Sequence, residues 1–263
     1  MNTFSIGSMF SFGWETFKKR PWFFIGVTVL IIVINFLIGK IINAIAANGG
    51  VMALLGNIIN LATSTLIGMG TVALYLKAHD NTESAQVADL WHPQGFWRYL
   101  GAILLYGIAM IIAMIPFIIA IFLGIVSIFT AIGFSEGGNA GGASGASGVI
   151  GIVAFILALI GIVLALYVSS MLIFGPYTVI DRGTGPINAL KESMRITKGN
   201  RWKIVGFLVV GILIAILGFI CLFVGIFVAA PVISLALTHL YRMLSGAAPM
   251  QTPTPVAAPA PIT

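Results

Sequence analysis

The sequence predicts an all-α, polytopic membrane protein with six transmembrane helices. Only 8% of the 263 residues are charged and 59% are hydrophobic, whereas about a quarter of the residues in soluble domains are charged. Several apolar runs exceed the ~18 residues that mark a membrane-spanning helix. Nearly all Lys and Arg residues lie between these runs or at their ends. A soluble domain of this length is excluded, because it would need far more polar surface.

The six spans follow from the lengths of the apolar runs. The last run, 203–241, would measure ~58 Å as one helix, about twice the ~30 Å hydrocarbon core of a bilayer. It must therefore turn back once, between Gly218 and Gly225. The predicted spans are about 22–47, 51–76, 97–124, 149–175, 203–221 and 224–243.

The run 97–133 allows two interpretations, which the basic residues separate. It is either two short spans broken at Pro116 or one kinked helix whose end projects from the bilayer. With six spans in all, every Lys and Arg except Lys40 falls on one side of the membrane. Splitting the run would move the basic loop 182–203 to the other side, against the positive-inside rule. The charges therefore predict six spans, an inner (cell) membrane location and cytoplasmic N- and C-termini.

A Trp-x-x-x-Gly pattern opens three of the apolar runs, at Trp22, Trp97 and Trp202. Each tryptophan is predicted to be an interfacial anchor at the cytoplasmic start of a helical hairpin. Apolar residues at helical spacing precede each start, which predicts cytoplasmic amphipathic surface helices. These helices are expected within 3–20, 82–92 and 186–197, the last beginning at Pro186 and stopping at Gly199. The chain is thus read as three pseudo-repeated hairpins; the alternative is chance recurrence of Trp and Gly.

The integral membrane domain is expected to cover 1–248, with two segments of different composition. Residues 134–148 are rich in Gly and contain no Lys or Arg, which predicts a flexible external loop. Residues 249–263 are rich in Pro, Ala and Thr, which predicts a disordered tail. The single cysteine, Cys221, lies in an apolar run and so predicts neither a disulfide framework nor a thiolate metal cluster.

Three stretches carry a resemblance to a known family. They are "FSFGWETFKKRPWFFIG", "GPINALKESMRITKGNRWKIVGF" and "PVISLALTHLYRML". Together they resemble the bacterial integral membrane proteins related to the membrane domain of glycerophosphoryl diester phosphodiesterases, over about 4–244. The resemblance implies a fold and an inner-membrane location rather than an activity. Some relatives continue into a catalytic domain; only 245–263 follow here, so we expect none, and no catalytic residue carries over.

The polar residues of 79–92 are the best candidates for chemistry in the sequence. They are His79, Asp80, Glu83, Asp89 and His92. These residue types bind metals, but their spacing fits no metal motif, and a solvated polar loop is the preferred interpretation. No Gly-x-Ser-x-Gly or His-Glu-x-x-His motif occurs, although either would have indicated a hydrolase. We therefore expect no enzymatic activity, no catalytic or metal residues and no cofactor.

Polar residues within the predicted spans are few and uncharged. Asn57, Asn60 and Ser64 share one helical face, which favours hydrogen bonding between helices over a solute path. His239 is predicted to be an anchor near the inner interface, beside Arg242. Carboxylates are missing from the spans, so a proton or sodium relay has no obvious carrier.

Two classes of function remain open. The first is a non-enzymatic protein that holds anionic lipid, or a membrane protein partner, at the cytoplasmic leaflet. Its candidate headgroup contacts are Lys198, Arg201 and Lys203, at the start of the fifth span, where the negative inner leaflet attracts basic residues. The alternative is a small-solute permease or transporter component with a pathway between the hairpins. The net charge of +6 does not indicate nucleic acid, because in a membrane chain the location of the charges matters more than their sum.

Overall fold

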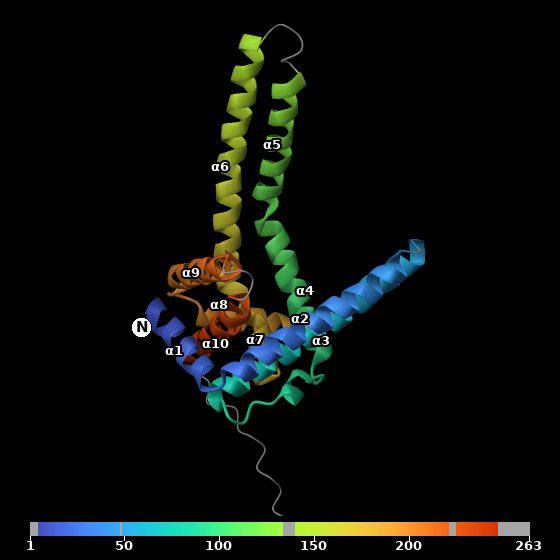
Figure 1. Ribbon diagram of the computed structural model, residues 1–263. Helices are drawn as coiled ribbons and strands as arrows, with labels where there is room; N and C mark the ends of the chain where they lie inside the picture. The colour runs from blue at the N-terminus through green and yellow to red at the C-terminus, as the bar shows by residue number, and fades with distance from the viewer. Residues whose placement is uncertain (1–4, 48, 134–139, 221–224, 247–263) are drawn as a thin grey trace, which may run out of the picture. The chain divides into compact units, whose positions relative to one another are not determined.

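Helices make up every secondary-structure element of the computed structural model (Figure 1). The structure describes residues 5–47, 49–133, 140–220 and 225–246, with the side chains of 132–146 left aside. Six of the helices are long and apolar enough to cross a membrane, so the predicted all-α class and number of spans are confirmed at this level. The chain forms two compact units, Asn2–Gln94 with Leu217–Thr263, and Gly95–Ile216.

The first unit packs the two ends of the chain together. It contains α1 (Ile6–Lys19), α2 (Pro21–Ala46), α3 (Gly50–Asp80), the short 3-10 helix η1 (Val87–Leu90) and α10 (Ile226–Ser245). α10 packs against α1, α2 and α3, and Figure 1 shows α1 beside α10. Their closest approach is at Gly13, where a Cβ atom would lie 2.5 Å from the carbonyl oxygen of Val232. Glycine is therefore required at this helix contact.

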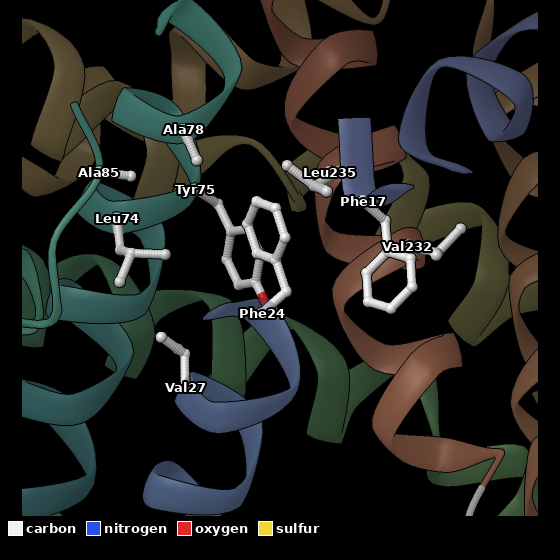
Figure 2. Close-up of a cluster of buried hydrophobic side chains, with 9 residues drawn as sticks. All are labelled: Phe17, Phe24, Val27, Leu74, Tyr75, Ala78, Ala85, Val232 and Leu235. Carbon is white, nitrogen blue, oxygen red and sulfur yellow. The ribbon is translucent and has the colours of Figure 1, made fainter. Parts of the chain in front are cut away.

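The core of this unit brings side chains from all four helices into one cluster (Figure 2). The aromatic rings of Phe24 on α2 and Tyr75 on α3 lie parallel, with centroids 6.3 Å apart. Phe17 on α1 and Leu235 on α10 complete the cluster from the other side. Because these residues come from both ends of the sequence, the core joins the N- and C-terminal segments into one packed body.

The second unit is dominated by a long antiparallel pair of helices. It contains α4 (Phe96–Ala113), α5 (Ile115–Gly133), α6 (Ala140–Leu172), α7 (Gly175–Arg182), α8 (Pro186–Ile196) and α9 (Arg201–Ile220), the last as far as Ile216. Figure 1 shows α5 and α6 side by side along their length. Most of the large side chains of α5 and α6 are exposed, which is the pattern of helices whose outer faces meet lipid.

The run 97–133 is a single bent helix rather than two antiparallel spans. α4 and α5 both pack against α6, and the chain continues through a turn at Met114. The Met114 amide still donates to the Met110 carbonyl, at 2.9 Å. Pro116 has no N–H to continue this ladder, so the bend follows from the proline. The structure therefore agrees with the interpretation of this run as one kinked helix, and not with two short spans.

α7 and α8 cover the end of α4 and are fixed to α6 and α4 by polar contacts. The Ser193 hydroxyl donates to the Met171 carbonyl at 2.7 Å, and the Arg98 guanidinium donates to the Gly183 carbonyl at 2.8 Å. Gly101 on α4 packs against Pro186, whose Cγ would lie 2.7 Å from a Cβ at this position. The predicted helix over 186–197 is present as α8, and it is followed by Gly199 with φ of +89°.

Three details differ from the prediction. Residues 82–92 contain no α-helix but turns and η1, because this segment lies against α3 and its Asp89 side chain caps the 3-10 turn. Helix α6 already begins at Ala140, inside the segment 134–148 that was expected to be a loop, and the Ser147 carbonyl accepts a hydrogen bond from Ser127 on α5. Residues 134–139, the tail 249–263 and Cys221 lie outside the described residues.

The third predicted hairpin is divided between the two units. α9 belongs with the second unit as far as Ile216, whereas α10 belongs with the first. The reason is packing: α10 finds its buried partners on α1, α2 and α3, and half of its most apolar window is buried, against 22% for α9. The three pseudo-repeated hairpins therefore stay a prediction.

Candidate functional sites

The first candidate site is the basic junction, defined as Lys198, Arg201 and Lys203 where α8 leads into α9. Thr197 ends α8, and its buried hydroxyl donates to the Ser193 carbonyl at 2.9 Å. The chain then turns through Gly199, and the Ile204 amide donates to the Asn200 carbonyl to start α9. Lys198 and Lys203 are exposed and Arg201 is half-buried. The turn therefore presents three cations within six residues, at the beginning of an apolar helix.

Arg201 is held by Tyr167 of α6. Its Nη1 donates to the Tyr167 hydroxyl at 3.2 Å, and its guanidinium lies 5.9 Å from the centre of the Tyr167 ring. The Trp202 ring packs at a tilt against the same tyrosine, with centroids 5.6 Å apart. The Nε atom of Arg201 is buried and makes no hydrogen bond within the described part of the chain. A buried N–H of this kind requires an acceptor.

Arg182 and Arg195 differ from Arg201, because each of them already forms an ion pair with the carboxylate of Glu192. Glu192 accepts from Arg195 at 2.6 and 2.7 Å and from Arg182 at 2.8 Å. The hydrogen bond from Arg195 is the largest cause that lowers the pKa of Glu192 below 4.5. The positive charge on this surface is therefore partly neutralised at Glu192 and is concentrated at the basic junction.

The basic junction has the chemistry of an anion site. The first amides of α9 have no partner within the helix, and the helix start carries a partial positive charge. A phosphate at this position would meet these amides, the side chains of the basic junction and the unsatisfied Nε of Arg201. The exposed Trp202 is suited to the region between headgroups and hydrocarbon. An anionic group attached to an apolar body therefore fits this surface better than a free anion.

The second candidate site is the α3–α10 polar cluster, defined as His79, Asp80, His239 and Arg242. Arg242 Nη2 donates to Asp80 Oδ2 at 2.6 Å, and the two side chains are only 5% and 6% exposed. The other carboxylate oxygen lies 3.0 Å from His79 Nδ1. His79 Nε2 in turn lies 3.0 Å from His239 Nδ1. Four side chains of two helices thus form one chain of hydrogen bonds.

The carboxylate fixes the direction of one hydrogen bond in this chain. A carboxylate oxygen accepts, so His79 Nδ1 donates to Asp80. The direction of the contact between His79 Nε2 and His239 Nδ1 depends on the tautomers of the two rings. Phe12 of α1 stacks on His239 with centroids 3.9 Å apart and an angle of 11°. The cluster therefore fastens α3 to α10, and α1 covers it.

Comparison with known proteins places the chain in a family. The sequence model described as "Protein of unknown function (DUF975)" matches residues 15–248. The chain belongs to the DUF975 family. No curated protein and no solved structure matches it. The matched range covers every residue of the basic junction and of the α3–α10 polar cluster, so both sites lie in the part of the DUF975 chain that the family shares.

The five polar residues of 79–92 do not form the solvated loop that was predicted. His79 and Asp80 end helix α3 and are buried in the polar cluster. Asp89 pairs with Lys77 at 2.7 Å and accepts from the Gln86 amide. Glu83 is exposed, and His92 lines an apolar groove. Among the described residues, no three His, Cys, Asp or Glu side chains gather in a way that could hold a metal ion.

The other predicted residues of the DUF975 chain are found on its surface. Trp22, Trp97 and Trp202 are 83%, 78% and 68% exposed, which an interfacial anchor requires. The polar stripe of α3 is exposed as well: Asn57, Asn60 and Ser64 face outward. Ser64 donates to the Leu61 carbonyl of its own helix, at 3.1 Å. Hydrogen bonding between helices is therefore not the role that the described contacts give this stripe.

Sequence reasoning missed the polar cluster because it treated its members separately. His239 was assigned to the membrane interface, and Asp80 to a loop. The sequence did contain a signal for this cluster. With six spans, the C-terminal ends of α3 and α10 lie on the same side of the membrane. Each end carries a histidine, and Asp80 on α3 is opposite in charge to Arg242 on α10. A buried ion pair between two span ends is the arrangement that such a combination favours.

Proposed function

We propose that this DUF975 chain is a non-enzymatic membrane protein that retains an anionic lipid at the basic junction. In this proposal the chain lies in the inner membrane with both termini cytoplasmic, and α1 and α8 lie along the inner surface. The proposed kinship with the membrane domain of glycerophosphoryl diester phosphodiesterases agrees with such a role, because that domain would serve to hold lipid-directed proteins at the membrane. A membrane protein partner with an acidic surface would use the same residues.

The observation that carries the proposal is Arg201. Its Nε is buried without an acceptor, while its Nη1 is held by Tyr167. A lipid phosphate bound at the start of α9 would supply the missing acceptor. Lys198 and Lys203 add ~1 kcal/mol each when they face an anionic leaflet. Trp202 marks the depth at which headgroups lie.

The proposal also states that the chain catalyses no reaction. Asp80 and His79 are engaged with Arg242 and His239, so they support the packing of α3 on α10. We expect purified protein to hydrolyse no phosphodiester, with or without added divalent metal. Turnover that disappears in Asp80→Asn would instead assign the polar cluster a catalytic role.

The test compares the lipids that co-purify with two triple variants. In the first, Lys198→Gln, Arg201→Gln and Lys203→Gln remove the basic junction. In the control, Lys18→Gln, Lys19→Gln and Lys191→Gln remove the same charge from exposed positions elsewhere on the proposed cytoplasmic side. Native mass spectrometry of each full-length protein reports phosphatidylglycerol and cardiolipin adducts.

We expect the first variant to lose its anionic adducts and the control to keep them. Both should insert, because ten Lys and Arg residues remain of thirteen and the positive-inside signal is preserved. If the basic-junction variant retains the same lipids as the wild type, these residues only orient the chain in the membrane.

A further inference from the structure

An apolar groove lies on the first unit, between α2, α3 and the segment that includes η1. Its volume is ≈ 330 Å³. One wall is a stripe of α2 residues at helical spacing, and the other is formed by α3. The lining residues are Leu30, Ile31, Ile34 and Ile38 of α2, Thr63, Leu66 and Ile67 of α3, and Val87, Leu90, Trp91 and His92. The groove is separate from both the basic junction and the α3–α10 polar cluster.

The two helical walls offer no free polar group. Thr63 is their only polar side chain, and its hydroxyl donates within α3 to the carbonyls of Ile59 and Asn60, at 2.8 and 3.1 Å. Its methyl group is therefore what the wall presents. All seven helical lining residues are half-buried, so each keeps surface that an occupant would cover.

The third side of the groove depends on a close contact between η1 and α3. A Cβ atom on Gly70 would lie 1.8 Å from the carbonyl oxygen of Leu90, so only glycine lets the segment reach this position. The Lys77–Asp89 ion pair holds the preceding turn. As a result Leu90 and Trp91 lie beside the apolar part of α3 rather than beyond its end.

We propose that this groove binds one hydrocarbon chain of a membrane lipid. Both helical walls belong to candidate membrane spans, so hydrocarbon is the medium that the groove faces once the protein is embedded. The stripe from Leu30 to Ile38 is ~12 Å long, close to the ~15 Å depth of one leaflet. The length and the absence of free polar groups in the walls fit an extended acyl chain better than a polar solute.

The orientation of the lipid follows from the polar residues at the loop side. Trp91 and His92 have an apolar body and a polar edge, the chemistry found where hydrocarbon meets headgroups. The glycerol end of the lipid is therefore placed beside these two residues, and the chain end between Ile34, Ile38 and Thr63. Because the recognised part is the acyl chain, binding is indifferent to headgroup charge.

The experiment uses the full-length protein in mixed micelles with a photoreactive phosphatidylcholine. The lipid carries a diazirine within one acyl chain, and mass spectrometry maps its adducts after illumination. We expect adducts to concentrate on the lining residues of α2 and α3. Ile34→Trp fills the groove and should lower this labelling at least about tenfold, which corresponds to excluding two methylene groups from burial. The matched control is Leu37→Trp, because Leu37 is exposed on the same helix and outside the groove.

Two further variants keep the test decisive. Ile67→Trp fills the groove from the opposite wall, in case Ile34→Trp does not fold. Gly70→Ala displaces η1 and should reduce labelling, whereas Gly39→Ala, which has open space around it, should not. Equal labelling of the wild type and both filled variants, or equal labelling of exposed positions such as Ile32 and Phe36, would show ordinary lipid contact and overturn the proposal. The triple Gln variant of the basic junction should label normally, so this result is independent of the proposed function.

Discussion

The α3–α10 polar cluster and the basic junction both contain an arginine, but the two sites differ in how far their charges are buried. In the polar cluster, Asp80 and Arg242 are almost fully buried and form an ion pair at 2.6 Å. In the basic junction, Lys198 and Lys203 are exposed, and Arg201 keeps a buried N–H without an acceptor. A buried ion pair stabilises a contact between helices, whereas exposed cations are accessible to a ligand. The accessibility of the charges, rather than their presence, therefore separates the polar cluster from the basic junction.

The largest expected effect concerns the side of the membrane on which both sites are placed. In a Cys221→Ser background, Ser144→Cys should react completely with an impermeant thiol reagent added to intact cells. Lys191→Cys, close to the basic junction, should stay unlabelled until the membrane is opened, because the positive-inside rule retains this basic segment in the cytoplasm. Labelling at position 191 in sealed cells would contradict the six-span topology and would remove the anionic leaflet from the basic junction.

The next effect is on stability, and it distinguishes the paired charges. Arg242→Gln leaves the Asp80 side chain buried without its ion-pair partner, so the free energy of unfolding should fall by about 3–5 kcal/mol. Lys77→Gln removes an ion pair whose side chains are 29% and 21% exposed, and should cost at most ~1 kcal/mol. Denaturant unfolding in detergent measures both variants. Similar losses would mean that burial does not distinguish the polar cluster from an ordinary surface pair.

The contact that covers the polar cluster can be tested at Gly13. Gly13→Ala forces α1 away from the Val232 carbonyl, and such overpacking should cost about 1–3 kcal/mol. Gly26→Ala on α2 has open space around it and should be neutral or slightly stabilising, because alanine favours helix. The unfolding temperatures of the two variants, compared with that of the wild type, measure these effects. An unaffected Gly13→Ala would show that α1 does not need its close approach to α10.

The smallest effect is a dependence on pH beside the basic junction. Glu192 has a lowered pKa, because Arg195 donates hydrogen bonds to it. Glu192 therefore stabilises the folded chain fully above pH 4.5, the pKa of this group in the unfolded chain. This contribution is lost as the pH falls through the lower pKa that Glu192 has in the folded chain. The wild type should lose up to ~1 kcal/mol over this range that Glu192→Gln does not lose. Parallel stability curves for the two proteins would contradict the pairing.

Elements with local signals were predictable from the sequence. Pro186 and Gly199 delimit α8 because proline starts helices and glycine permits the left-handed turn after them. Charge distribution and run length were sufficient for six spans. Contacts between distant residues left no periodic signal, so the pairing of Asp80 with Arg242, 162 residues apart, was missed. The segment 82–92 was mispredicted as an amphipathic helix because its contact with Gly70 is tertiary and overrides local spacing.

The division of the last two spans was also beyond the sequence. α9 and α10 have the same length and both are apolar enough to span a membrane, but it is α10 that packs on Gly13 and Phe17 of α1. Such a preference depends on shape complementarity between helices far apart in the sequence. The basic junction, in contrast, could be proposed from the sequence because its three cations are neighbours in the chain, and its role stays a prediction.

The most direct test of lipid binding at the basic junction is the unfolding temperature in the presence of added lipid. Purified wild type in detergent is titrated with phosphatidylglycerol, with phosphatidylcholine and, in a third arm, with inorganic phosphate. A lipid that binds only the folded chain stabilises it by ~2.7 kcal/mol at a hundredfold excess over its dissociation constant. We predict that only phosphatidylglycerol raises the unfolding temperature, and that the Lys198→Gln, Arg201→Gln, Lys203→Gln variant shows no such rise. An equal rise in this variant, or with phosphatidylcholine, would contradict anionic lipid binding at the basic junction.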